Sequence, residues 1–185
     1  MFEIKWYVED ESAYDSYSRD LKHIGCPLCR GIGNLNRHGV LKGFGDEQKR
    51  QEEVVRGFRV FCSNRGNRQG CGKTHSVLLA KYLYRHSVQT REVGLFFNGL
   101  LEGKSLERSW YDSVRFFCVE TGRAIWRKFS RTHLTIRSRL FGQKNNSSQK
   151  ESRLVTWEGI PSDFKSNDPV RDYQLYFQRA FFSSG

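Results

Sequence analysis

Four of the five cysteines lie in the first half of the chain at spacings that suit a metal site. Cys26 and Cys29 enclose a Pro-Leu pair, and Cys62 and Cys71 follow after a spacer of 32 residues. Two thiolates on one tight turn supply half of a tetrahedral zinc site, and a second pair completes it. The pattern therefore predicts Zn²⁺ bound by Cys26, Cys29, Cys62 and Cys71.

The second cysteine pair is unusual because eight residues separate its members. The intervening sequence SNRGNRQG contains two glycines and two asparagines, which adopt positive φ angles more readily than other residues. Such a segment can leave and rejoin the turn while Cys62 and Cys71 still converge. We interpret it as a metal-binding turn with an insertion, which displays Arg65 and Arg68 beside the metal.

Other interpretations of these cysteines stay open at this point. Disulfides are disfavoured if the protein is cytosolic, and a redox Cys-x-x-Cys motif normally accompanies a βαβ pattern that is missing here. His38 or His75 could replace one cysteine, since zinc accepts imidazole nitrogen as well as thiolate. Cys118 lies in the apolar stretch VRFFCV with no partner at ligand spacing, and we expect it to be a buried free thiol.

The segment from Cys26 to Val77 resembles the N-terminal zinc ribbons of bacterial insertion-sequence transposases. Those ribbons often read Cys-Pro-x-Cys, then Arg-His-Gly, then Arg-(Tyr/Phe)-x-Cys, then Cys-Gly-Lys-Thr-Phe-Ser-Val. The resemblance covers about a third of the chain and implies the zinc-ribbon architecture of small DNA-binding proteins. This chain departs from the pattern in its enlarged second turn and in His75, where an aromatic residue is usual. The matching residues are Cys26, Pro27, Cys29, Arg37, His38, Gly39, Phe58, Cys62, Cys71, Gly72, Lys73, Thr74, Ser76 and Val77.

Strands and helices must position these residues, and the chain divides into regions accordingly. Apolar and polar residues alternate in GFRVF before Cys62 and in KTHSVL after Cys71, which predicts a strand on each side of the second turn. We therefore expect an α+β fold, with a small antiparallel zinc ribbon followed by a helical domain. The regions are 1–20, an acidic, aromatic N-terminal strand region; 21–85, the zinc ribbon; 86–140, a helix-turn-helix-like domain; and 141–185, a linker (142–152) and a tail with a short helix after Asp168-Pro169.

Three helices are predicted in the helical domain. In residues 89–101 apolar side chains recur every three or four positions, Gly103 can end this helix, and Ser105 can cap the next one. A third, basic helix is expected from about Thr121. This order is typical of a helix-turn-helix, although the segment Val114–Glu120 is longer than its usual turn.

Positive charge is concentrated in the predicted ribbon and third helix. The net charge is +11, and residues 121–141 contain six basic and no acidic side chains. Clustered basic charge with a pI near 9.6 is typical of a nucleic-acid-binding protein. Arg123, Arg127 and Arg131 follow one another at helical spacing and so share a face. We expect nucleic-acid contacts from Arg65, Arg68, Lys73, Arg123, Arg127, Lys128 and Arg131.

Together these features predict a non-catalytic, zinc-dependent protein that binds double-stranded DNA, as a mobile-element accessory factor or a transcriptional regulator. A protein partner in a transposition or transcription complex is also expected. Too little chain follows the third helix for a metal-dependent nuclease domain, and no Gly-x4-Gly-Lys-Ser/Thr loop is present. The alternatives are an adaptor that docks a larger nucleic-acid machine through the ribbon, and an RNA-binding protein that stacks bases on its aromatic residues.

The sequence also bears on membranes and location. No run of about 18 apolar residues is present, so no membrane partner is expected. The N-terminus lacks a basic start followed by an apolar stretch, which argues against a signal peptide. We expect the protein to act in the cytoplasm.

Overall fold

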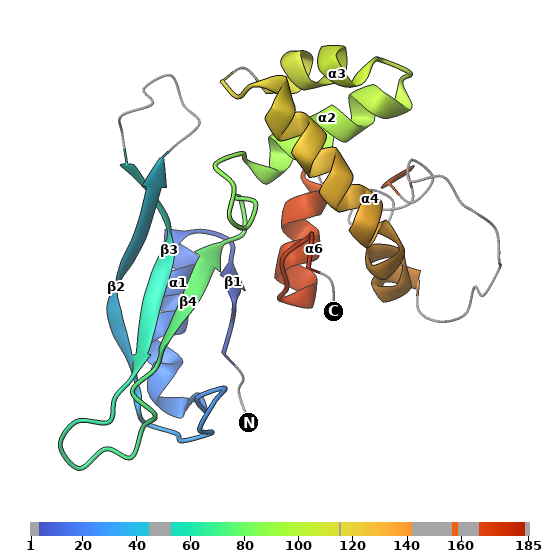
Figure 1. The fold of residues 1–185 in the computed structure, drawn as a ribbon. Helices are drawn as coiled ribbons and strands as arrows, with labels where there is room; N and C mark the ends of the chain where they lie inside the picture. The colour runs from blue at the N-terminus through green and yellow to red at the C-terminus, as the bar shows by residue number, and fades with distance from the viewer. Residues whose placement is uncertain (1–3, 45–52, 115, 142–156, 159–166, 184–185) are drawn as a thin grey trace. The chain divides into compact units, whose positions relative to one another are not determined.

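The computed structural model describes residues 4–44, 53–114, 116–141, 157–158 and 167–183. These residues form two compact units, one that extends to Tyr82 and one that begins at Leu83. We call them the N-terminal unit and the C-terminal unit. The first contains a four-stranded sheet and the second is helical, so the chain is a mixed α/β protein (Figure 1).

The sheet of the N-terminal unit has the strand order β1-β4-β3-β2. The long strands β2 (Leu35–Phe44) and β3 (Glu53–Cys62) pair antiparallel, and β4 (Thr74–Leu79) continues this pattern beside β3. The two-residue strand β1 (Tyr7–Val8) is parallel to β4 at the sheet edge. Of the strand region predicted at 1–20, only these two residues form a strand among the residues described.

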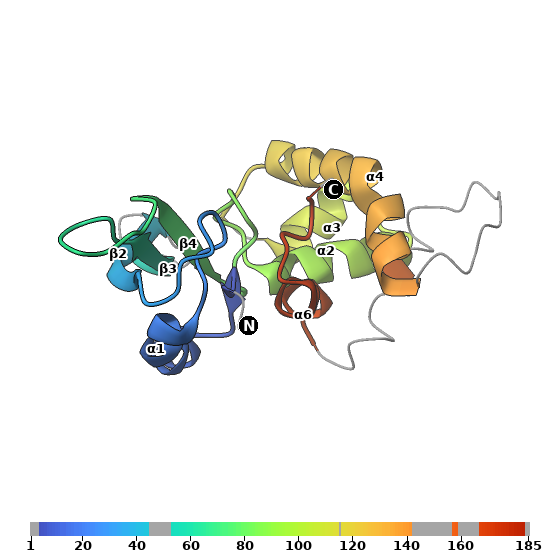
Figure 2. The same cartoon turned by 90° about the horizontal axis from the view of Figure 1, so that it is seen from below.

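Helix α1 (Glu11–Arg19) lies along one face of this sheet (Figures 1 and 2). Its first turn is capped by Asp10, whose carboxylate accepts a hydrogen bond from the Ala13 amide at 2.7 Å. The ring of Tyr14 stacks on Phe58 of β3, with centroids 3.7 Å apart and planes 2° from parallel. This helix occupies part of the region where a strand was expected, because the polar residues of Glu11–Arg19 outnumber the two tyrosines that it buries and mask its helical pattern.

The C-terminal unit is built from α2 (Thr90–Leu101), α3 (Leu106–Ser113), α4 (Val119–Phe141) and α6 (Pro169–Phe177). The predicted helix ends are confirmed. Gly103 has φ +81° after α2, the hydroxyl of Ser105 accepts a hydrogen bond from the Arg108 amide, and Asp168 caps α6. The core of the C-terminal unit is aromatic. It includes Phe97, Trp110, Phe129, Trp157 and Phe181, which are all fully buried.

Helix α3 is fixed between its neighbours by two close contacts. The Ser109 hydroxyl donates to the Phe96 carbonyl of α2 at 2.6 Å, and the Trp110 indole donates to the Phe117 carbonyl at 2.9 Å. Gly122 of α4 lies against the Trp110 ring, where an added Cβ would come within 2.7 Å of a ring carbon. A glycine at this position is what lets α4 approach α3.

Cys118 is exposed, not buried, because it directly precedes α4 and its sulfur contacts the Thr121 hydroxyl at 3.8 Å rather than the core. The predicted linker at 142–152 lies outside the described residues. Among the residues that the structure describes, no helix combines the length and the apolar character that a membrane span requires.

Candidate metal centre

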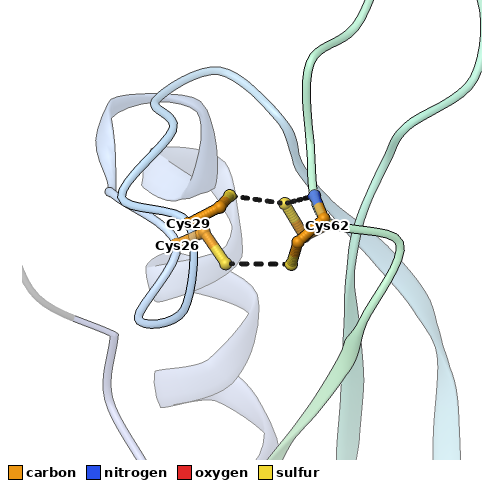
Figure 3. Close-up of side chains that lie close together, drawn as sticks. Cys26, Cys29 and Cys62 are labelled. Atoms are coloured by element: carbon orange, nitrogen blue, oxygen red, sulfur yellow. Dashed lines mark hydrogen bonds between the residues drawn. The ribbon is translucent and has the colours of Figure 1, made fainter.

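The structure brings together the four cysteines that the sequence singled out. Cys26 and Cys29 lie on the loop after the short 3-10 helix η1 (Asp20–His23), Cys62 ends β3, and Cys71 precedes β4. Their sulfurs all lie within 4.8 Å of one another and could hold a metal ion. The Cys26 and Cys71 sulfurs are 3.7 Å apart. Those of Cys29 and Cys62 are 3.6 Å apart (Figure 3). Disulfide bonds are about 2.05 Å long, so these are free thiols.

The first cysteine turn is closed by two backbone hydrogen bonds. The Arg30 amide donates to the Cys26 carbonyl at 2.8 Å, and the Cys26 amide donates to the Gly31 carbonyl at 3.1 Å. Arg30, the residue after Cys29, adopts a left-handed conformation with φ +59°. This backbone reversal points both sulfurs to the same side of the loop.

The second turn repeats this pattern. The Gly72 amide donates to the Cys62 carbonyl at 2.9 Å, and the Cys62 amide donates to the Lys73 carbonyl at 2.9 Å. Gly72, the residue after Cys71, has φ +69°. Despite their different spacings, the two pairs therefore have the same closing hydrogen bonds and the same left-handed position.

The additional residues between Cys62 and Cys71 form a separate loop that leaves the second turn after Ser63 and rejoins it at Gly70. The Gly70 amide donates to the Ser63 carbonyl at 3.1 Å, so Ser63 and Gly70 correspond to the two residues between Cys26 and Cys29. Residues 64–69 form the loop between them, and all six are exposed. We call residues 64–69 the inserted loop. Its geometry agrees with the interpretation of an enlarged turn.

Hydrogen bonds from backbone amides lower the pKa of these cysteine thiols, whereas burial raises it. A hydrogen bond from the Gly31 amide lowers the pKa of Cys29, which is exposed, to about 7. Burial raises the pKa of Cys26, and it raises that of Cys62 to about 12, although backbone amides donate to both sulfurs. Ionised Cys26 and Cys62 are therefore disfavoured unless a cation compensates their charge. A bound metal ion supplies such a charge.

His75 lies beside the cluster. Strand β4 alternates between exposed and buried residues, and this period of two places His75 on the buried face with Val77 and Leu79. Its Nε2 atom lies 3.4 Å from the Cys26 sulfur. Burial lowers the pKa of His75, so the ring is neutral at pH 7. His38 is exposed on β2 and lies against Phe61, outside the cysteine cluster.

Arg68 of the inserted loop meets a second basic side chain, Lys22 of η1. Lys22 Nζ and Arg68 Nη1 both donate to the Asn36 side-chain oxygen, at 2.5 Å and 3.0 Å. The pKa of Lys22 is lowered, first by desolvation and then by the charge of Arg68. No carboxylate pairs with either cation within the described part of the chain. Sequence reasoning missed Lys22 and Asn36, because no spacing relates them to Arg68.

The other predicted nucleic-acid residues are exposed but differ in their contacts. Arg65 and Lys73 lie on the inserted loop and after Cys71, and Arg127 and Arg131 lie on α4. Arg123 instead forms ion pairs with Glu107 of α3 at 2.6 Å and with Glu120 at 2.5 Å.

Lys128 contacts a histidine. Its ammonium lies 2.6 Å from His86 Nε2. Because an ammonium group only donates, the ring nitrogen accepts this hydrogen bond. The contact fixes the Lys128 charge close to residues that precede α2.

Comparison with protein-family models, with curated proteins and with solved structures gives no match in any of the three. The resemblance to transposase ribbons therefore stays a prediction from the sequence motifs.

Proposed function

We propose that this chain is a non-catalytic DNA-binding protein in which a structural zinc ion holds a zinc ribbon and presents basic residues to the phosphate backbone. The observation that carries the proposal is the junction of the cysteine cluster with the Lys22–Arg68 pair. The cluster fixes both ends of the inserted loop through Cys62 and Cys71, and this loop carries Arg68 to Lys22.

The four sulfurs fit zinc in number, type and spacing. In a regular tetrahedron with zinc–sulfur bonds of about 2.3 Å, neighbouring sulfurs lie about 3.8 Å apart. Two of the sulfur pairs here are 3.6 and 3.7 Å apart, and all four sulfurs lie within 4.8 Å of one another. Four cysteine ligands leave no open position for substrate or water, which is the composition of a structural rather than a catalytic zinc site. When bound, zinc supplies the positive charge that keeps the buried thiolates ionised.

The Lys22–Arg68 pair supports phosphate binding. Two like charges that share one neutral amide oxygen repel each other, and an anion placed between them would relieve this repulsion. Both side chains are exposed to solvent. Phosphate oxygens are the anions that Arg and Lys contact most often in DNA complexes, and these contacts supply most of the sequence-independent affinity.

The C-terminal unit supports a second, helical contact with DNA. We assign α4 as the recognition helix of a helix-turn-helix-like domain, with Arg127, Lys128 and Arg131 on its exposed side. The Arg123 guanidinium is compensated by two carboxylates, so it contributes less to DNA affinity than Arg127. The resemblance to transposase ribbons supports a cytoplasmic role in transposition or transcription.

The proposal is tested by measuring affinity for a labelled DNA duplex at several salt concentrations. The logarithm of affinity should fall linearly with the logarithm of salt concentration. In the double variant Arg65→Gln/Arg68→Gln the slope should decrease by about two, because each lost phosphate contact removes about 0.9 from it. The control Arg19→Gln/Arg108→Gln removes the same charge from exposed helix positions and should keep the parental slope.

Three outcomes would contradict the proposal. Absence of duplex binding at low salt would favour a protein-interaction adaptor. Stronger binding of single-stranded RNA than of duplex DNA would favour an RNA-binding protein. Equal slopes for the two double variants would show that the inserted loop does not contact DNA.

A further inference from the structure

The C-terminal unit contains a cavity of about 560 Å³, and its lining includes Lys128 and Arg131, two of the proposed DNA contacts. It lies between the segment before α2, the middle of α4 and the residues after α6. Its volume falls within the range of roughly 300–1,000 Å³ that is usual for small-molecule sites.

Three cations surround this cavity. Arg85 comes from the segment before α2, and Lys128 and Arg131 lie almost one turn apart on α4. All three are exposed, and none forms an ion pair with a carboxylate in the described ranges. No acidic residue lines the cavity. The positive charge of the cavity therefore favours an anionic ligand. The planar, donor-rich guanidinium groups of Arg85 and Arg131 favour a phosphate in particular.

The rest of the lining is aromatic and apolar. Of the aromatic residues that line the cavity, Tyr84 is 46% exposed, Phe182 is half-buried and Phe181 is fully buried. An exposed aromatic ring beside arginine and lysine is the combination with which proteins stack a nucleobase and hold its phosphate. A bare phosphate or sulfate would leave this apolar lining unused.

We propose that this cavity binds a single nucleotide, with the phosphate held by Arg85, Lys128 and Arg131 and the base packed on Tyr84 and Phe182. The nucleotide is either free or the 5′-phosphorylated end of a single strand, since both present the same groups. Two features preorganise the cavity. The Arg85 guanidinium lies 5.1 Å from the centre of the Tyr84 ring, and His86 holds the Lys128 ammonium.

The backbone of Arg85 suggests a specific variant. Arg85 has φ +61°, a conformation that asparagine tolerates better than most residues. Arg85→Asn therefore removes the cation while the backbone is kept. Arg30 provides a matched control, because it is also an exposed arginine with positive φ, at +59°, and lies in the N-terminal unit.

The test is calorimetric titration of the full chain with adenosine monophosphate, uridine monophosphate and inorganic phosphate. We expect one saturable site for the nucleotides and weaker binding of inorganic phosphate. Arg85→Asn should weaken nucleotide binding about tenfold, corresponding to the loss of one charge-assisted contact. Tyr84→Ala should weaken nucleotide binding by a similar factor and weaken phosphate binding less, because the base loses its packing surface whereas the three cations remain. The control Arg30→Asn should leave the affinity for the nucleotides unchanged.

A 5′-phosphorylated trinucleotide identifies the source of the nucleotide. Binding tighter than that of the monophosphate indicates a strand end, and equal or weaker binding indicates a free nucleotide. The proposal is overturned if no nucleotide saturates the protein at millimolar concentration, if Arg85→Asn and Arg30→Asn bind alike, or if inorganic phosphate binds as tightly as the nucleotides.

The same variants separate this proposal from DNA binding. Arg65→Gln/Arg68→Gln should retain nucleotide affinity, because both residues lie in the N-terminal unit. A chain that binds nucleotides but no duplex would refute the proposed function and leave the cavity assignment intact. A chain that binds duplex DNA but no nucleotide would refute the cavity assignment and leave the proposed function intact.

Discussion

The Nε2 atom of His75 lies 3.4 Å from the sulfur of Cys26. The neutral ring can donate one hydrogen bond to a thiolate from this position. A histidine that contacts one sulfur of a four-sulfur cluster stabilises the charge of that ligand without occupying a coordination position. His75 can therefore act as a hydrogen-bond donor to Cys26, which is the alternative to its replacing a cysteine as a metal ligand.

Substitution of His75 by phenylalanine should leave one zinc ion per chain. The hydrogen bond to Cys26 is lost, and metal affinity should fall about 10- to 100-fold, as is usual when a partner of a ligand is removed. Competition with a chromophoric chelator measures this change, and elemental analysis gives the stoichiometry. Loss of the metal altogether would identify the imidazole as a ligand. The control His38→Phe should retain parental affinity.

Each of the four clustered cysteines should be needed for full metal affinity, whereas Cys118 should not. Cys62→Ser should lose most of the bound zinc, because the metal would then have three thiolates and one weakly binding hydroxyl. Cys118→Ser is the matched control, since that cysteine is exposed and outside the cluster. Elemental analysis of the purified variants, combined with circular dichroism, checks both expectations. Full zinc content in Cys62→Ser would contradict the ligand set.

Deletion of residues 64–69 should leave the metal centre intact. Ser63 and Gly70 are already joined by a 3.1 Å hydrogen bond, and the shortened chain would read Cys-Ser-Gly-Cys, with the spacing of the first pair. One zinc per chain is expected, together with a weaker duplex affinity because Arg65 and Arg68 are removed. If the deletion abolishes metal binding, the inserted loop is part of the turn and not an addition to it.

Gly122→Ala should destabilise the C-terminal unit. The added methyl group would come within 2.7 Å of the Trp110 ring, and such overpacking costs about 1–3 kcal/mol. Better helix propensity would offset about 1 kcal/mol of this cost. Urea unfolding followed by tryptophan fluorescence measures the change. Ser138→Ala, at an exposed position of α4, should alter stability by less than about 0.5 kcal/mol. Equal stabilities of the two variants would show that α3 and α4 can separate without cost.

Local sequence patterns predicted much of the secondary structure. The alternation around Cys62 and His75 corresponds to β3 and β4, and the glycine and cap residues mark the ends of α2 and α3. These features are local, since a strand period, a cap or a helix end depends on residues within a few positions. Helix α1 was missed because its few apolar residues are aromatic rings separated by a mostly polar sequence.

The sequence by itself indicated which four cysteines gather and that eight residues separate Cys62 from Cys71. The Gly70–Ser63 hydrogen bond of the tertiary structure set the bounds of the inserted loop. The tertiary structure alone decided that the two cysteine turns close in the same way and that His75 faces Cys26. It also decided that Lys22 meets Arg68, that Arg123 is compensated by carboxylates, and that Cys118 is exposed. Contacts of this kind join residues that are far apart in the chain or on different elements. They are set by how strands and helices pack, which no local spacing encodes.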